Sequence, residues 1–431
     1  MKCALINPNW TFRGSVYFGC REPHLPLEYG YAKALLENGG HEVLLVDGRS
    51  EALSPGEIRE RVAGFAPDLA VVTTAPSYLF WRCAPPELRV PKETAAVLRT
   101  VCGTLAAIGP HGSVTPVSVL EKLGVEVVIM GEGEEIIPLL AARERREWGD
   151  VPSVCYRENG TIRVQGGPHA SDLSRLPALH WPDATIRGHC HHHHRFEVPP
   201  SSPGAELEAS RGCPYRCSFC AKGAFRDRYR KRPLSVVLEE VDGLLAQGVG
   251  YLYFIDEIFL PDRGLLRALG EREVKFGIQT RIDLWSHEML DLLGSAGCVS
   301  IEAGIESISE RGRALLEKSC SLSTEALLDL LIRARKSVPF VQATLLDAQV
   351  DTPEDTERWR RFLLDFGIWA NKPVPVFPYP GSREYEKRWG PPDARAWERA
   401  HAYYLEKYRS FSDIQESRLL PLECLEREAA E

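Results

Sequence analysis

Three cysteines in the segment Cys213-Pro-Tyr-Arg-Cys217-Ser-Phe-Cys220 carry the clearest chemical signal in this chain. Thiolates are the usual ligands of iron–sulfur clusters, and three of them can each hold one iron of a four-iron cluster while the fourth iron stays open to a small molecule. A structural zinc site needs a fourth cysteine or histidine close by, and the nearest candidates are the histidines at 189–194. The spacing therefore favours a [4Fe-4S] cluster, with an isolated metal-binding knuckle as the alternative.

The composition is that of a globular enzyme rather than a nucleic-acid or membrane protein. The 431 residues are 44% apolar and 26% charged, with a net charge of −8, which argues against a nucleic-acid partner. No apolar run approaches the length of a membrane span, and the start of the chain lacks the layout of a signal peptide. Twelve cysteines in a chain of this length are no disulfide framework. We therefore expect reduced thiols, a cytoplasmic location and no membrane partner.

Apolar segments alternate with helical patterns over the first third of the chain. Strands are expected at 3–8, 42–47, 68–74, 105–109 and 125–130, and helices at 25–38, 55–65, 92–101, 115–123 and 134–142. Five strands that alternate with helices predict a doubly wound parallel sheet. Ligands of such sheets bind beyond the carboxyl ends of the strands.

Small residues follow three of these expected strands, and they would let a flat or phosphate-bearing ligand approach the backbone. The candidate contacts in these turns are Thr73, Thr74, Gly109, Pro110, His111, Gly131, Glu132 and Gly133. Such turns are common at strand ends, so a degenerate nucleotide-binding-like domain that binds nothing is the alternative.

Together with its surroundings, the cysteine segment resembles the signature of the radical S-adenosylmethionine (radical SAM) superfamily, in which SAM chelates the open iron. The turns ahead of it resemble the cobalamin-binding domain of the B12-dependent members. The resemblance implies an α/β chain: a Rossmann-like doubly wound cobalamin-binding domain, a linker, a partial (βα)6 barrel of the TIM type and a helical C-terminal extension. The expected bounds of these four parts are 1–145, 146–205, 206–377 and 378–431. Segment 7–13 lacks the Asp-x-His-x-x-Gly motif whose histidine ligates cobalt in other cobalamin proteins.

The same resemblance implies a SAM site at the ends of the barrel strands. Asp256 and Glu257 would hold the SAM amino group, and Arg281 would pair with its carboxylate, which guanidinium groups bind in a bidentate manner. Glu306 would lie near the ribose, and Lys318 occupies a place where some relatives have a basic residue. Each of these side chains has a plainer interpretation as a helix cap or a solvated charge.

Three further segments leave alternatives open. The run 189–194 is rich in histidine, which suits a metal site, an active-site role or a polar linker. The basic cluster 226–232 either meets phosphate groups or forms a solvated loop. Aromatic residues at helical spacing near the C-terminus are expected mostly to pack on the barrel, and some to close the substrate cavity. These residues are Trp397, His401, Tyr404 and Tyr408.

The resemblance implies a cobalamin-dependent radical SAM methyltransferase that acts on an unactivated carbon of a small-molecule substrate. Its cofactors would be a [4Fe-4S] cluster, SAM and cobalamin, and flavodoxin or ferredoxin would supply electrons. No side chain is assigned a catalytic role, because the cofactors carry the difficult chemistry. A radical rearrangement or cyclisation on the same cofactors is one alternative, and a non-catalytic cobalamin or redox sensor is another.

Overall fold

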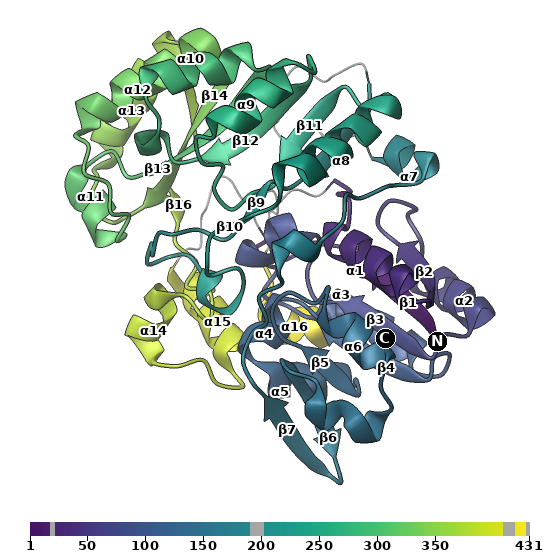
Figure 1. Cartoon of the computed structure of the whole chain (residues 1–431). Helices are drawn as coiled ribbons and strands as arrows, with labels where there is room; N and C mark the ends of the chain where they lie inside the picture. Colours follow the sequence, from purple (N-terminus) through teal and green to yellow (C-terminus); the bar gives the residue numbers. More distant parts are fainter. Residues whose placement is uncertain (18–21, 190–201, 408–418, 428–431) are drawn as a thin grey trace.

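The computed structural model describes residues 1–17, 22–189, 202–407 and 419–427. Residues 190–194 of the histidine-rich run, and Tyr408, lie outside this part. Figure 1 shows two sheets, one in each half of the molecule, with the barrel half above the N-terminal half. Within the described ranges, none of the helices combines the length and apolar character needed to cross a bilayer.

The N-terminal sheet has the strand order β2-β1-β3-β4-β5-β6-β7. Its first five strands are parallel: β1 Lys2–Asn7, β2 Glu42–Asp47, β3 Leu69–Thr73, β4 Thr104–Ile108 and β5 Val127–Ile129. The helices of this half are α1 Leu27–Asn38, α2 Pro55–Phe65, α3 Arg89–Leu98, α4 Pro110–Val114, α5 Pro116–Leu123 and α6 Ile136–Ala141. Alternate residues of β1 face opposite layers: Leu5 lies in the core cluster that includes α1 and α6, and Ile6 in the one that includes α2, α3 and α5.

Two antiparallel strands extend this sheet into the segment that was expected to be a linker. They are β6 Val154–Glu158 and β7 Thr161–Gln165, and β6 pairs with β5. Asn159 and Gly160 join them with positive φ values of 50° and 81°. An Asn-Gly pair between two strands is the strongest short-range signal for a hairpin, so the sequence did contain the cue. Segment 146–205 is therefore not only a connection between domains.

The second sheet is a partial barrel of six parallel strands in the order β15-β14-β13-β12-β11-β8. Its strands are β8 Gly204–Leu207, β11 Tyr251–Phe254, β12 Lys275–Thr280, β13 Cys298–Glu306, β14 Phe340–Asp347 and β15 Trp369–Ala370. The helices after successive strands are α8 Leu234–Ala246, α9 Arg263–Gly270, α10 His287–Ser295, α11 Glu310–Leu315, α12 Thr324–Ser337 and α13 Pro353–Asp365. This architecture confirms the expected α/β fold class.

Shorter elements complete the chain. Between β8 and α8, the strands β9 Ser210–Arg211 and β10 Arg230–Lys231 form an antiparallel ribbon, which lies between the two halves in Figure 1. β16 Val374–Pro375 pairs with the end of β14, and α7 Asp183–Gly188 precedes the barrel. The 3-10 helices are Tyr78–Cys83, Arg145–Asp150, Leu173–Arg175, Lys222–Ala224 and Ile282–Leu284.

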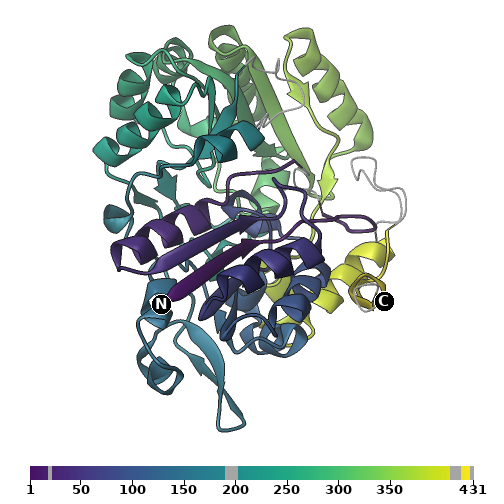
Figure 2. The ribbon, with the colours of Figure 1, turned by 90° about the vertical axis from the view of Figure 1, so that its right-hand side faces the viewer.

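The C-terminal extension lies against the N-terminal half as well as the barrel. It contains α14 Arg383–Trp389, α15 Ala396–Lys407 and α16 Leu422–Arg427, and Figure 2 shows its last helices beside the N-terminal sheet. Trp397 lies on the ring of His111 at a centroid distance of 4.2 Å, whereas Tyr404 contacts Phe377 at 5.3 Å. Lys122 of α5 pairs with Glu398 of α15 at 2.5 Å. Most of these aromatics were expected to pack on the barrel, but Trp397 packs on the N-terminal half. The sequence pattern identifies a buried helix face but not the partner of that face.

Candidate active site

The cysteine-bearing loop begins at a glycine that no other residue can replace without movement. Gly212 has a φ of +79°, and a Cβ atom there would lie 2.0 Å from the carbonyl oxygen of Arg228. Its amide donates a hydrogen bond of 2.6 Å to Oε2 of Glu257. These constraints fix the path of the backbone immediately before Cys213.

The three cysteine thiols are half-buried and lie near one another. Burial raises the pKa of each thiol, to about 12 for Cys217. Cys220 adds to the rise of the pKa of Cys217, and Cys213 adds to that of Cys220, as expected for thiols whose negative charges would repel at short range. The thiols therefore stay protonated until a metal displaces the proton.

Cations surround this loop and favour the thiolate form. The positive charges of Arg82 and Lys222 partly offset the rise in the pKa of Cys213 and Cys220 that burial causes. Lys318 partly offsets the rise in the pKa of Cys217. Lys222 Nζ also donates to the carbonyl oxygens of Cys213 and Asp227, which closes the loop on itself. Neither Arg82 nor Lys222 was predicted from the sequence. Lys222 could have been found because it lies two residues after Cys220, whereas Arg82 has no such proximity.

Three thiols set among cations suit a cluster with three thiolate ligands. Among the described residues, no group of three His, Cys, Asp or Glu side chains is arranged around a single metal ion. A [4Fe-4S] cluster needs no such convergence, because each of the three thiolates binds a different iron and the fourth iron stays open.

Asp256 and Glu257, which the resemblance predicts as SAM ligands, lie just after β11 and accept hydrogen bonds from the start of the cysteine loop. Asp256 accepts hydrogen bonds from the amide of Ala209, at 2.9 Å, and from the hydroxyl of Ser210. Burial raises the pKa of Asp256 to about 7. Glu257 accepts from Gly212 and, at 2.8 Å, from the guanidinium of Arg226. Both carboxylates thus have protein partners in this structure.

Arg281, Glu306 and Lys318 meet near Cys217 of the cysteine loop. Arg281 donates to the carbonyl oxygen of Lys318 at 2.5 Å and to Oδ2 of Asp283 at 2.7 Å, and it lies 3.8 Å from the ring centre of Tyr215. The ammonium group of Lys318 lies 2.5 Å from Oε2 of Glu306. Glu306 has a φ of +64° where the pairing register of β13 and β14 shifts, so its side chain leaves the regular strand alternation.

The turns after β3 and β4 touch each other. A Cβ atom on Gly109 would lie 2.1 Å from Oγ1 of Thr74, so this approach requires glycine. His111 donates from Nε2 to the carbonyl oxygen of Pro85 at 2.9 Å, and its Nδ1 lies 3.3 Å from Oγ1 of Thr74. Burial lowers the pKa of His111 to about 3, so the ring is neutral. The neighbouring Thr73 and Pro110 are buried as well.

The turn after β5 is turned toward the barrel. Gly131 forms a bridge with His169, and Gly133 lies against Ile108. The carboxylate of Glu132 is fully buried and pairs with Arg211, at 2.8 Å, and with Arg230. Glu132 was predicted as a cobalamin contact, but its side chain is occupied by these arginines.

The carboxyl ends of the two sheets face each other. Arg82, which follows β3, donates to the carbonyl oxygen of Glu257 at 3.1 Å. In the same region, the rings of Trp81 and Phe225 lie 4.8 Å apart. Since ligands of parallel sheets bind beyond the carboxyl ends of the strands, both ligand-binding edges of this chain open onto one junction.

The basic cluster 226–232 is solvated only in part, because Arg228 and Lys231 are exposed whereas its first and last arginines are buried. Arg226 and Arg232 are only 2% and 4% exposed. Arg226 pairs with Glu208 and Glu257, and Arg232 pairs with Glu240 at 2.8 Å. The sequence showed a run of charge, but the carboxylates that neutralise it come from distant strands and a helix.

His189 is the one member of the run 189–194 within the described residues, and it is fully buried. It donates from Nδ1 to the carbonyl oxygen of Thr185 at 2.7 Å, and its Nε2 lies 3.3 Å from Oδ2 of Asp47. Burial opposes protonation of the ring, but the nearby carboxylates of Asp47 and Glu206 raise the pKa of His189. His189 thus anchors the end of α7 to the N-terminal sheet.

Comparison with known proteins agrees with this geometry. Residues 207–363 match the family described as the Radical SAM superfamily. An uncharacterized methyltransferase of Pyrococcus horikoshii is 23% identical over 401 residues, which cover 90% of this chain and 83% of the relative. The anaerobic magnesium-protoporphyrin IX monomethyl ester cyclase of Rubrivivax gelatinosus is 25% identical, over 86% of this chain and 67% of the relative.

A solved structure has the same architecture. It is the radical SAM methyltransferase TsrM of Kitasatospora setae, determined with cobalamin and a [4Fe-4S] cluster. The TM-score is 0.66 at 20% identity, with 89% of this chain and 73% of that chain covered. Residues 207–363 therefore form a radical SAM domain, and the chain shares its overall fold with TsrM. This confirms the family expected from the sequence.

Proposed function

We propose that this protein is a cobalamin-dependent radical SAM enzyme that methylates an unactivated carbon of a small molecule. The observation that carries the proposal is the junction of the two sheets. The carboxyl ends of a doubly wound sheet and of a partial barrel face each other there, and the loop with Cys213, Cys217 and Cys220 lies in the barrel half of that junction. A reaction that needs two cofactors close together requires such an arrangement.

In this proposal the three cysteines hold the cluster, and Arg281, Glu306 and Lys318 bind SAM beside it. Asp256 and Glu257 would act on SAM mainly through the cysteine loop that they support. The turns at 73–74, 109–111 and 131–133 would hold cobalamin mainly through their backbone. When bound, the cluster supplies the electron that cleaves SAM, and cobalamin carries the methyl group to the substrate. The surrounding protein orients these groups and excludes water.

We further propose that the cobalamin-binding unit ends near Gln165 rather than at residue 145, because β6 and β7 complete its sheet. An electron donor such as flavodoxin or ferredoxin would reduce the cluster in a reducing, cytoplasmic setting. The substrate is a small molecule; tryptophan is the substrate bound to TsrM in one structure, at 19% identity to this chain.

The test is anaerobic reconstitution with iron, sulfide and cobalamin, followed by incubation with SAM labelled in its methyl group and with a low-potential reductant such as dithionite, which supplies the electrons for the cluster and for cobalamin. We expect release of 5′-deoxyadenosine and transfer of the labelled methyl group to reduced cobalamin. Cys217→Ala should abolish the cluster and the release of 5′-deoxyadenosine, and a Cys217→Ala protein that still cleaves SAM would refute the assignment. Cys424→Ala is the matched control, because Cys424 is an exposed cysteine of the C-terminal extension.

Cyclisation without methyl transfer is the second candidate, because one relative of similar coverage is named a cyclase. The same experiment separates the two functions. Release of 5′-deoxyadenosine without any transfer of the labelled methyl group to cobalamin would favour cyclisation.

A further inference from the structure

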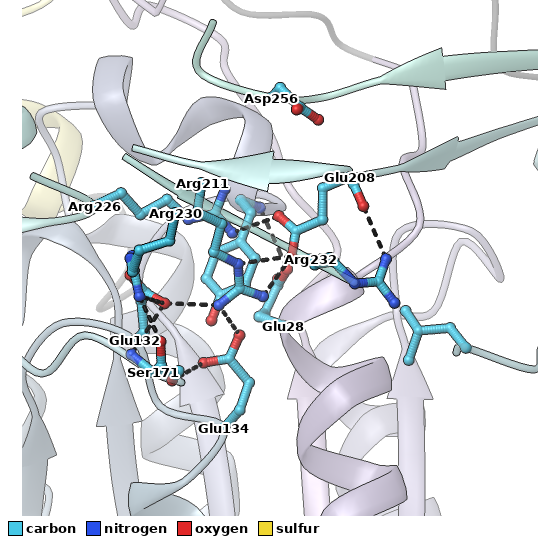
Figure 3. A network of polar contacts seen from close by, with 12 residues as sticks. Glu28, Glu132, Glu134, Ser171, Glu208, Arg211, Arg226, Arg230, Arg232 and Asp256 are labelled. Atoms are coloured by element: carbon cyan, nitrogen blue, oxygen red, sulfur yellow. Dashed lines mark hydrogen bonds and ion pairs between the residues drawn. The ribbon is translucent and has the colours of Figure 1, made fainter. Parts of the chain in front are cut away.

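A buried ionic network joins the turn after β5 to the start of the cysteine loop (Figure 3). Arg211, two residues before Cys213, lies at its centre. Its Nη1 is 2.8 Å from Oε2 of Glu132 and 2.6 Å from Oε1 of Glu134. Its Nε donates to Oε1 of Glu208 at 2.7 Å. One guanidinium group thus binds two carboxylates of the N-terminal half and one of the barrel.

Arg211, Glu132 and Glu208 are charged despite their burial. The side chains of Arg211, Glu132, Glu134 and Glu208 are all 0% exposed. Although burial opposes it, the nearby arginines lower the pKa of Glu132 and bring that of Glu208 to about 2. The rings of Tyr31 and Tyr78 lie 5.2 and 5.0 Å from the guanidinium carbon of Arg211. Every charge therefore has a partner, as a buried charge requires.

The network continues to the end of β11. Glu208 binds Arg226 at 3.0 Å, and Arg226 binds Glu257 at 2.8 Å. Glu257 then accepts from the amide of Gly212 at 2.6 Å. The chain of charged hydrogen bonds thus starts at the turn proposed to hold cobalamin and returns to the residue before Cys213.

Charge pairs of this kind are a costly way to join two domains, since well-packed apolar residues often stabilise as well or better. They differ from apolar contacts in being directional. Glu132 and Glu134 flank Gly133 and approach the same guanidinium, so a shift of the turn by one residue would leave charges unpaired. Ser171 holds both carboxylates from the other side, with its amide on Glu132 and its hydroxyl on Glu134.

We infer that Arg211 is a positioning residue that fixes the separation and orientation of cobalamin relative to the iron–sulfur cluster. The inference rests on the proposed function, because it takes the turn at 131–133 as part of the cobalamin site. It assigns Arg211 no contact with a cofactor. Its effect passes through the backbone on either side: the turn after β5 in one half, and the residues before Cys213 in the other.

The test measures that separation directly in the holoenzyme. With the cluster reduced and cobalamin as cob(II)alamin, both centres are paramagnetic, and pulsed electron paramagnetic resonance reports their distance distribution. We expect a narrow distance distribution in the parent. In the double variant Glu132→Gln/Glu134→Gln we expect a broad or displaced distance distribution. In that variant, methyl transfer from SAM to cobalamin should fall by up to about 100-fold, the cost of a displacement near 1 Å. Abortive release of 5′-deoxyadenosine, which needs only cluster and SAM, should fall far less.

Glu240→Gln is the matched control. It removes a carboxylate from an equally buried arginine, Arg232, but touches neither the turn after β5 nor the cysteine loop. We expect Glu240→Gln to keep the parental distance distribution. If the double variant does not fold, Glu134→Gln alone decides, because it leaves Arg211 its contacts with Glu132 and Glu208. A parental distribution and parental methyl transfer in the loaded variant would overturn the inference. A parent that binds no cobalamin would overturn the proposed function instead, before any variant is made.

Discussion

Replacing Gly212 by alanine should disturb the cysteine loop more than its small size suggests. At a φ of +79° an alanine pays roughly 1–2 kcal/mol for the left-handed backbone. The added Cβ would lie 2.0 Å from the carbonyl oxygen of Arg228, well inside the 3.0 Å below which real Cβ contacts essentially never fall. Backbone must therefore move by about 1 Å on one side, and such crowding costs a further 1–3 kcal/mol or so. The expected total is about 2–5 kcal/mol.

The movement has a chemical consequence because Cys213 is the next residue. The hydrogen bond from Gly212 to Glu257 has to lengthen or break, and the first thiol shifts relative to the other two. Anaerobically reconstituted Gly212→Ala should therefore hold clearly less iron and sulfide per chain than the parent. Its denaturation midpoint should also be lower in the cluster-free state, where only the protein part of the effect remains.

Gly248→Ala is the control for this prediction. Gly248 has a similar φ of +82°, but nothing lies within 4 Å of its Cβ position. Its substitution carries the backbone cost without the collision, and it lies outside the cysteine loop. If Gly212→Ala matches Gly248→Ala in both midpoint and iron content, the collision with Arg228 is absorbed without strain and the reasoning fails.

Three further predictions concern the buried ionisable groups. Glu257→Gln loses a charge-assisted hydrogen bond with Arg226, at a cost of about 1.5–3 kcal/mol. Both the iron content and the SAM affinity of this variant, the latter measured by equilibrium binding, should fall. A loss of SAM affinity alone would show that Glu257 is a direct SAM ligand. Bound cob(II)alamin should show no histidine nitrogen coupling in its electron paramagnetic resonance spectrum, because Nε2 of His111 donates to the carbonyl oxygen of Pro85 and so is not free to bind cobalt. Clear coupling that disappears in His111→Ala would contradict this prediction. Burial raises the pKa of Glu28 to about 8 from 4.5, so the folded protein keeps a proton that the unfolded chain releases, and stability should fall as the pH rises from 4.5 to 8. In Glu28→Gln this fall, on the order of a few kcal/mol, should largely vanish from denaturation midpoints; an unchanged pH profile would show that Glu28 is ionised in the folded state.

The order of strands and helices was predictable because it is written in local patterns. All five parallel strands of the N-terminal sheet were expected within two residues of their observed starts. The barrel strands lie within the expected segment 206–377, except that β8 begins two residues earlier, at Gly204. The hairpin β6–β7 was not predicted, although the pair Asn159-Gly160 is typical of a hairpin turn. A short antiparallel pair at a sheet edge has weak apolar periodicity, so only its turn could have revealed it.

The partners of charged residues were not predictable in the same way. Glu132 and Arg211 are 79 residues apart, and Glu257 and Arg226 are 31 apart. Glu132 and Glu257 were predicted as ligand contacts and Arg226 as part of a phosphate-binding or solvated cluster, whereas Arg211 was not singled out. Pairing depends on which sheet edges the fold brings together, and periodicity within a segment carries no information about that.

These pairs show that a carboxylate at a strand end of this chain can hold a loop in place. Asp256 and Glu257 lie at the end of β11, where the family resemblance implied SAM ligands, yet their oxygens bind Ala209, Ser210 and Gly212. A cluster-bearing loop that is half-exposed and starts at a left-handed glycine would not hold one path by itself, because it has few apolar contacts of its own. The carboxylates at neighbouring strand ends hold the loop in a single backbone path. In the proposed site the strand ends would therefore act in two ways: directly, through groups that face the cofactors, and indirectly, through groups that hold the cysteine loop.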